Sequence, residues 1–215
     1  MKFTPVLLPI IIEAIAVVIE KNAVEVTDLD QALGDGDHVI NLQRGIDALM
    51  VERTELTELG WVDAWQKIGM TLMASVGGAS GSLYGTLFIA LSKAGHDKDL
   101  TLQDFADILT QGVEAVKKRG RSDLGEKTLL DVFIPVANYL HTASVDSTPL
   151  ADVLDNVSKV AIAGVESTRN MLATKGRASF LEERSLGHID AGAKTAQLMI
   201  CAIIDILSKQ LKSPA

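Results

Sequence analysis

The chain has one cysteine, five prolines and only 4% aromatic residues, and these scarcities exclude several classes of protein. A single cysteine, Cys201, excludes an internal disulfide framework and favours a reducing compartment. The apolar residues around it predict a buried small side chain rather than a nucleophile. Because aromatics are few, the core has to consist of Ala, Leu, Ile, Val and Met, and a hydrophobic fraction of 47% is sufficient for that.

Positive charge is also scarce, since 20 Lys and Arg face 28 Asp and Glu, for a net charge of −8. This balance argues against a nucleic-acid partner and against an anionic membrane surface. No uninterrupted apolar run approaches the ~20 residues that span a bilayer. Pro5 and Pro9 interrupt the apolar N-terminal segment, and a helical stripe continues from Ile12 to Ala23. We therefore expect a first helix there rather than a secretion signal, and a cytoplasmic protein.

Apolar residues recur at helical spacing along nearly the whole chain, and no convincing alternating pattern indicates a strand. The spacing predicts eight helices, over residues 5–21, 38–49, 61–75, 80–93, 101–119, 127–141, 148–172 and 190–211. Thr101 and Asp104 form a capping pattern at the start of the fifth. Short loops between such helices imply antiparallel neighbours, so we predict an all-α bundle or barrel. No shift in composition marks a second domain, and we expect residues 1–215 to form one.

The segment from Leu29 to His38 is the most unusual part of the chain, because it holds Asp30, Asp35 and Asp37. Carboxylates this close repel one another unless a hard cation sits between them, and Mg²⁺ prefers such oxygen ligands. The glycines on either side of Asp35 allow the backbone to fold the ligands inward. The pattern is not that of an EF-hand. The alternative is an acidic turn in which Asp37 caps the next helix.

Three other loops are rich in glycine or polar residues. Val76 to Ser82 is typical of a phosphate cradle at a helix start, or of a tight connection between two helices. Gly120 to Thr128 resembles a Walker A loop, but Glu126 separates Gly125 from Lys127 and no strand precedes it. Its lysine and threonine remain candidates to assist a nucleotide or simply to begin a helix.

The fourth loop, from Gly176 to Asp190, is long and polar, and we predict a lid without secondary structure of its own. Arg177 and Arg184 have the geometry to bind phosphate, or they pair with nearby carboxylates on the surface. In an up-down bundle, the loops that follow odd-numbered helices lie at one end. All four unusual loops follow odd-numbered predicted helices, so together they predict a Mg²⁺–nucleotide site at one rim.

With these motifs, the chain resembles the DhaL family, the ADP-binding subunits of bacterial dihydroxyacetone kinases, over essentially its whole length. The motifs that carry the resemblance are Leu29 to His38, Gly77 to Gly81, Gly125 to Asp131, and Gly176 to Asp190. The chain departs from the family pattern at Glu182, Ile189 and Ala191, where glycine, glutamine and proline are frequent.

The resemblance implies a barrel of eight antiparallel helices with ADP bound at one rim through two Mg²⁺ ions. Asp30, Asp35 and Asp37 would be the metal ligands. The residues implied to contact the nucleotide are His38, Val39, Ile40, Asn41, Ala79, Ser80, Gly120, Leu129, Arg177, Asp190, Ala191 and Gly192.

The resemblance also implies a mechanism and partners. ADP would stay bound as a coenzyme, a phosphotransferase-system protein would rephosphorylate it, and the phosphoryl group would pass to dihydroxyacetone on a separate subunit. Members of the family also bind a transcription activator. No histidine stands out as the residue that would hold a ketone covalently, which fits a separate substrate subunit. The alternatives are an ATP-dependent kinase subunit, the nucleotide domain of a fatty acid kinase, and a regulatory binding module. The sequence leaves homo-oligomerisation and the accepted triose or polyol open.

Overall fold

The computed structural model describes residues 3–212, and within them the chain forms nine α-helices, three short 3-10 helices and no β-strand. The α-helices are α1 (Leu8–Lys21), α2 (Ala23–Leu33), α3 (His38–Leu56), α4 (Trp61–Ser75), α5 (Gly78–Gly95), α6 (Leu102–Gly120), α7 (Leu130–Val145), α8 (Leu150–Ser167) and α9 (Ala191–Lys212). The 3-10 helices are η1 (Pro5–Leu7), η2 (Thr168–Asn170) and η3 (Arg177–Ser185). The all-α class predicted from the apolar spacing is confirmed.

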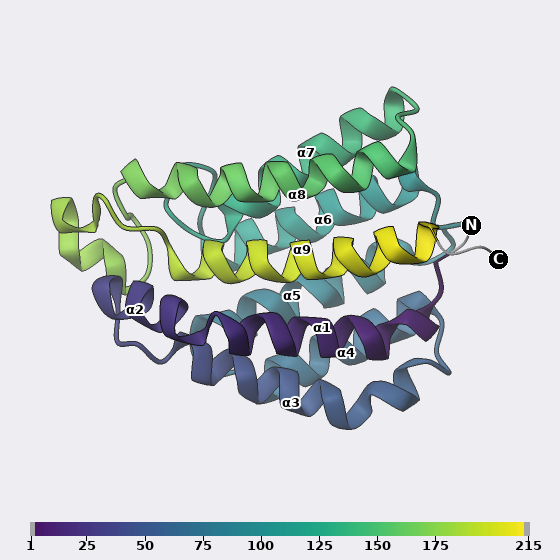
Figure 1. Cartoon of the computed structure of the whole chain (residues 1–215), viewed down its shortest axis with the longest axis horizontal. Coiled ribbons are helices and arrows are strands. Elements are labelled where there is room, and N and C mark those ends of the chain that lie inside the picture. The colour runs from purple at the N-terminus through teal and green to yellow at the C-terminus, as the bar shows by residue number, and fades with distance from the viewer. Residues whose placement is uncertain (1–2, 213–215) are drawn as a thin grey trace.

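Eight of the helices in the described part of the chain form a closed ring. Starting from α1, the ring runs through α3, α4, α5, α6, α7, α8 and α9, and α9 packs back against α1. Neighbours in the ring run in opposite directions, and both termini lie at one end of the barrel (Figure 1). The loops that precede α3, α5, α7 and α9 therefore meet at the other end, on the left of Figure 1. This is the predicted barrel of antiparallel helices, with the four unusual loops on one rim.

The helix α2 was not predicted, because the sequence was interpreted as a loop from Leu29 onward. It continues α1 after Asn22, lies outside the ring, and packs against α3, α9 and η3. Val26 and Leu33, seven residues apart, are its buried residues, and this stripe is too short to stand out among the charged residues around it. As a consequence, Leu29 and Asp30 belong to a helix that ends directly before the acidic loop.

Other predicted boundaries differ by a few residues. The capping box of Thr101 and Asp104 is confirmed at the start of α6. α7 begins at Leu130 instead of residue 127, because Lys127 adopts a φ of 60° that no α-helix accommodates. α8 ends at Ser167 instead of residue 172, and the loop after it contains η2 and η3 rather than lacking secondary structure.

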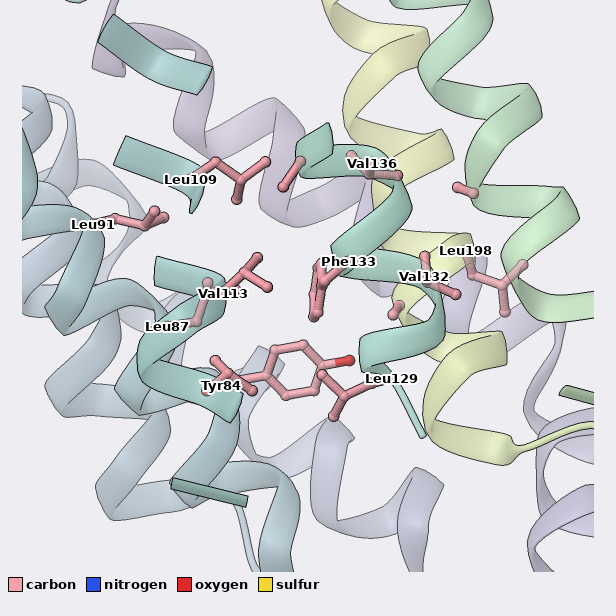
Figure 2. Close-up of a cluster of buried hydrophobic side chains, with 14 of the residues drawn as sticks. Tyr84, Leu87, Leu91, Leu109, Val113, Leu129, Val132, Phe133, Val136 and Leu198 are labelled. Atoms are coloured by element: carbon pink, nitrogen blue, oxygen red, sulfur yellow. The ribbon is translucent and has the colours of Figure 1, made fainter. Parts of the chain in front are cut away.

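The barrel interior is filled by aliphatic side chains and a few aromatic rings. Figure 2 shows Tyr84, Leu129 and Phe133 among them, where α5, α7 and α9 approach one another. The rings of Tyr84 and Phe133 meet edge to face, with centroids 6.2 Å apart at an interplanar angle of 82°. Cys201 is half-buried on α9 and accepts a hydrogen bond from Gln197. This packed core fixes the relative positions of the helices whose ends form the rim.

Among residues 3–212, α9 is the one helix whose length and mean hydropathy would suffice to cross a membrane. It carries Lys194 and Asp205, and it packs against α1, α7 and α8 as a member of the ring. Its buried residues include Ala193, Ala196 and Leu198, which face those neighbours. Its place in the barrel therefore explains the apolar residues on its buried side.

Candidate functional site

The three aspartates of the acidic loop come together at the rim. Asp30 lies in the last turn of α2, while Asp35 and Asp37 lie in the short loop before α3, and one carboxylate oxygen of each lies within 4.8 Å of the others. Asp30 is half-buried and the other two are exposed. Oxygen atoms at this spacing fit the ligand preference of Mg²⁺, which keeps its remaining positions for water and phosphate oxygens.

Helix capping does not account for this cluster. Asp37 occupies the position before α3, but its side chain makes no capping hydrogen bond. The backbone N–H of His38, at the start of α3, donates instead to Oδ2 of Asp30 at 3.1 Å. That bond leaves the second oxygen of Asp30 for a cation and fixes α2 relative to α3. The capping interpretation of Asp37 is therefore wrong, and the carboxylates gather without that role.

The loop between α4 and α5 lies directly beside α3. Gly77 and Gly78 form the turn, and Gly78 has a φ of 66°, which only glycine adopts readily. A Cβ atom at Gly77 would lie 2.3 Å from Oδ1 of the buried Asn41, so the turn can approach α3 this closely only without a side chain. No side chain caps the N-terminus of α5, where the helix dipole and the first N–H groups favour an anion. Ala79 and Ser80 lie in this first turn.

His38 connects three helices at the rim. Its Nδ1 lies 3.2 Å from the Ser80 hydroxyl on α5, and its Nε2 lies 2.9 Å from the Thr195 hydroxyl on α9. Burial lowers the pKa of His38, and the nearby Asp30 and Asp37 act in the opposite direction. The neutral ring of His38, with both nitrogens in hydrogen bonds, holds the N-terminus of α5 beside the carboxylates. Sequence reasoning missed Thr195. The pattern of a helix does not separate a threonine that contacts a distant histidine from any other threonine on the same helix.

Asp190 directly precedes α9. Its Oδ2 accepts a hydrogen bond of 2.7 Å from the Ala193 N–H, the pattern of an N-terminal cap. Burial raises the pKa of Asp190 to about 6, with Asp131 and Asp30 adding to the effect, while the Ala193 N–H and the Lys127 ammonium oppose it. Asp190 thus places a carboxyl with a raised pKa between the start of α9 and the acidic loop.

The other residues that the resemblance implied for the nucleotide also lie on or near this rim. Four of them are buried: Val39, Asn41, Leu129 and Ala191. Ile40 and Ala79 are exposed, and Ser80, Gly120, Asp190 and Gly192 are half-buried. Gly192 lies against Leu129, where a Cβ would be 3.8 Å from the leucine Cβ.

The segment of residues 168–190, here called the lid, is folded onto itself. The Arg169 carbonyl accepts from the Gly187 N–H at 2.8 Å, and the buried Ser185 hydroxyl accepts from the Ala173 N–H at 3.0 Å. At the tip, Arg177 forms an ion pair with Asp35. The two open interpretations of Arg177 were phosphate binding and pairing with a carboxylate of its own loop. In the structure it reaches across to the acidic loop.

The loop between α6 and α7 is organised by Asp131. Its two carboxylate oxygens accept from the Gly125 N–H at 2.6 Å and the Thr128 N–H at 2.7 Å. Lys127 points inward, with 1% of its surface exposed, and its Nζ donates to backbone carbonyls of the lid. Lys127 does not begin α7, and its ammonium lies buried beneath the rim instead of at the rim surface. A buried lysine in a polar loop carries no signal in the sequence.

Comparisons with known proteins show the family to which the chain is similar. The DAK2 domain matches residues 32–205. The chain is 41% identical over 186 residues to "PEP-dependent dihydroxyacetone kinase 1, ADP-binding subunit DhaL" of Listeria innocua serovar 6a, covering 86% of this chain and 88% of the relative. It is 37% identical over 175 residues to "PEP-dependent dihydroxyacetone kinase, ADP-binding subunit DhaL" of Escherichia coli K12, covering 81% and 83%.

Among solved structures, the fold matches the dihydroxyacetone kinase from C. freundii in complex with AMP-PNP and Mg²⁺, with a TM-score of 0.70 at 20% sequence identity. The match covers 95% of this chain and 34% of that one, so this chain spans about a third of the solved kinase. At this identity the likeness shows the fold.

Proposed function

Because this chain belongs to the DAK2 domain family, we propose that it is the ADP-binding subunit of a dihydroxyacetone kinase that depends on phosphoenolpyruvate. In this reaction, a protein of the phosphotransferase system phosphorylates bound ADP. The γ-phosphoryl group then passes to a hydroxyl of dihydroxyacetone, which returns the nucleotide to ADP. The chain is therefore a phosphotransferase subunit that acts together with a dihydroxyacetone-binding subunit.

The observation that carries this proposal is the position of the three aspartates beside an uncapped helix N-terminus. The oxygen ligands come from Asp30, Asp35 and Asp37. The N–H groups come from the first turn of α5, which His38 connects to the acidic loop through its hydrogen bond with Ser80. A diphosphate needs both, because cations neutralise its charge and N–H groups orient its oxygens. Bound Mg²⁺ would supply charge neutralisation at the transferring phosphoryl group. We propose two Mg²⁺ ions at this cluster.

The residues of the chain have binding and positioning roles in this proposal. Ser80 and Ala79 would present the α5 N-terminus to phosphate, and Arg177 would contribute positive charge from the lid. Asp190 and Gly192 at the start of α9 would meet the nucleotide from the opposite side. The remaining residues are proposed contacts along the same rim: His38, Val39, Ile40, Asn41, Gly120, Leu129 and Ala191.

The hydrogen bonds of His38 support the proposal that a separate partner subunit holds the substrate. Its two ring nitrogens are both engaged, by Ser80 and Thr195, so this histidine has none left for a ketone. We propose that dihydroxyacetone is held on the partner subunit, that a phosphotransferase-system protein is the donor, and that a transcription activator is a further partner. We also propose that ADP remains bound between cycles as a coenzyme. Cytoplasmic location remains a prediction.

Native mass spectrometry of the purified protein, before and after dialysis against EDTA, tests the site and the retained coenzyme. We expect a mass excess equal to ADP plus two Mg²⁺ that disappears with the chelator. Asp37→Asn should abolish the excess, because it removes one ligand of the cluster. Asp28→Asn is the matched control, since Asp28 is an exposed aspartate on α2 outside the cluster. Equal loss in both variants would contradict the assignment of the site.

The phosphoryl donor is tested with the partner subunit present. We expect dihydroxyacetone phosphate to form when phosphoenolpyruvate and the phosphotransferase proteins are supplied. Formation with free ATP alone, together with a purified protein that carries no nucleotide, would replace this proposal with the ATP-dependent alternative. Absence of nucleotide binding at any Mg²⁺ concentration would refute both.

A further inference from the structure

One buried ammonium group contacts both ends of the lid. Lys127 is the largest of the fully buried side chains in the described residues, with 1% of its surface exposed. Its Nζ donates to the Thr168 carbonyl at 2.6 Å and to the His188 carbonyl. Thr168 is the first residue of the lid and His188 lies near its end, so one side chain holds both ends of the segment.

Thr168 extends this contact to the start of α9. It is completely buried, and its hydroxyl donates to the Val165 carbonyl and accepts from the Asp190 N–H at 3.1 Å. Lys127, Thr168 and Asp190 therefore form one connected unit beneath the rim. The lysine thus contacts both ends of the lid directly, and it contacts the backbone of Asp190 through Thr168.

The surroundings of the ammonium act on it in both directions. Burial lowers the pKa of Lys127 and the nearby Arg169 adds to this effect, while Asp190 and Asp131 favour the charged form. An ammonium in such a place is costly unless its protons are bonded, and two lid carbonyls accept two of the three. Because carbonyl acceptors without a donor are also costly, the lysine and the lid ends stabilise each other.

The ion pair and the hydrogen bond that Glu126 of the α6–α7 loop makes with the lid lie nearer the surface. Glu126 pairs with Lys175 at 3.2 Å and accepts from the Thr174 hydroxyl at 3.1 Å, and these groups are partly or fully exposed. Exposed pairs contribute little, whereas bonds to a buried charge contribute more. Lys127 is therefore the main polar attachment of the lid base, beside the buried side chains of Ala173 and Ile189. Arg177 attaches the lid tip to Asp35.

We propose that Lys127 is a positioning residue that anchors both ends of the lid and so sets Arg177 and Asp190 at the nucleotide rim. Its effect on the nucleotide rests on the proposed function, but its effect on the lid does not. Loss of the ammonium should release the lid without unfolding the barrel. ADP should then dissociate faster, because the lid covers it less of the time.

Lys127→Met tests this, since it keeps most of the side-chain volume and removes the charge. In the protein without nucleotide, hydrogen exchange at the amides of Ala173, Gly187 and Asp190 should accelerate by at least about tenfold. Exchange in the ring helices should change only in proportion to global stability. The matched control is Leu140→Ala, a buried position on α7 away from the lid, which should speed exchange across the whole barrel.

Two further measurements separate anchoring from a general structural role. ADP dissociation in Mg²⁺ should accelerate in Lys127→Met and stay near the wild-type rate in Leu140→Ala. In Lys127→Ala, n-propylammonium should restore slow exchange of the lid amides, while 1-propanol should not.

The inference is overturned if lid exchange is unchanged in Lys127→Met, or if it rises in parallel with the whole chain as in Leu140→Ala. A Lys127→Met chain that does not fold even with ADP and Mg²⁺ also overturns it, because the lysine is then a general core element. Failure of the proposed function appears separately, as wild-type protein that does not bind ADP. The exchange measured without nucleotide still decides the role of Lys127.

Discussion

Replacing Asp190 with asparagine should change how the stability of the protein depends on pH. Burial raises the pKa of Asp190 from 3.8 to about 6, whereas the unfolded chain keeps the lower value. Folding therefore favours the protonated carboxyl. The contribution of Asp190 to stability is fully present below pH 3.8, and it is lost as the pH rises through about 6. Asparagine does not titrate, and its amide oxygen can still accept the hydrogen bond from the Ala193 N–H.

The magnitude follows from the size of the shift. A shift of about two pKa units corresponds to about 3 kcal/mol between the two protonation states. Roughly two thirds of this change in stability, about 2 kcal/mol, occurs between about pH 4.5 and about pH 7.5. The rest occurs mainly below about pH 4.5, because the carboxyl of the unfolded chain is already partly ionised there. The stability of Asp190→Asn relative to wild type should rise by that amount across the interval.

Urea denaturation of both proteins at several pH values, without nucleotide and with EDTA, measures this difference. Taking the difference between the two chains removes the other groups that titrate in the same range. A difference that stays constant with pH would refute the raised pKa. A difference that falls as the pH rises would show that Lys127 and the Ala193 N–H outweigh burial and hold the carboxyl in its charged form.

Two other substitutions test the local geometry of the rim, each with a control in the chain. Glu182 has a φ of 50° and a ψ of −128°, a conformation that strains a residue with a side chain, so Glu182→Gly should stabilise the protein by about 1 kcal/mol in urea denaturation. Glu183→Gly, one residue on, should bring no gain, and an equal gain would contradict the strain. Gly77→Ala would place a Cβ 2.3 Å from the Asn41 Oδ1, so it should cost about 1–3 kcal/mol and weaken ADP binding. Gly60→Ala is its control, because Gly60 precedes α4 with nearly the same backbone angles and open space around its Cβ, and equal effects would contradict the argument.

Several features of the site were accessible from the sequence because they depend on neighbours along the chain. Asp35 and Asp37 are separated by one residue, so any turn brings them together. The glycine turn at Gly77 combines conformational freedom with a helix start, and both are local properties. The departure from the family pattern at Glu182 was also visible. The structure gives it a physical meaning, because the position has a backbone conformation that suits the glycine frequent there.

Other features depended on residues far apart in the chain. Whether Arg177 bound its own loop or another one could not be decided, because the position of the lid relative to α2 is a tertiary property. The burial of Lys127 was not predicted, for the same reason. Its partners lie 41 and 61 residues away, and burial reverses the usual expectation that a lysine in a polar loop is solvated. Thr195 meets His38 from 157 residues away.

The sequence by itself determined the all-α class, the order of the ring helices and the four loops that carry chemistry, because apolar spacing and glycine positions act over a few residues. It also placed those loops at one rim, since antiparallel helices return alternate loops to the same end. Only the tertiary structure decided which side chains meet there: Arg177 with Asp35, His38 with Ser80 and Thr195, and Lys127 with both ends of the lid. These contacts depend on how the closed barrel brings distant segments within hydrogen-bond distance, and on burial that exists only once the ring has formed.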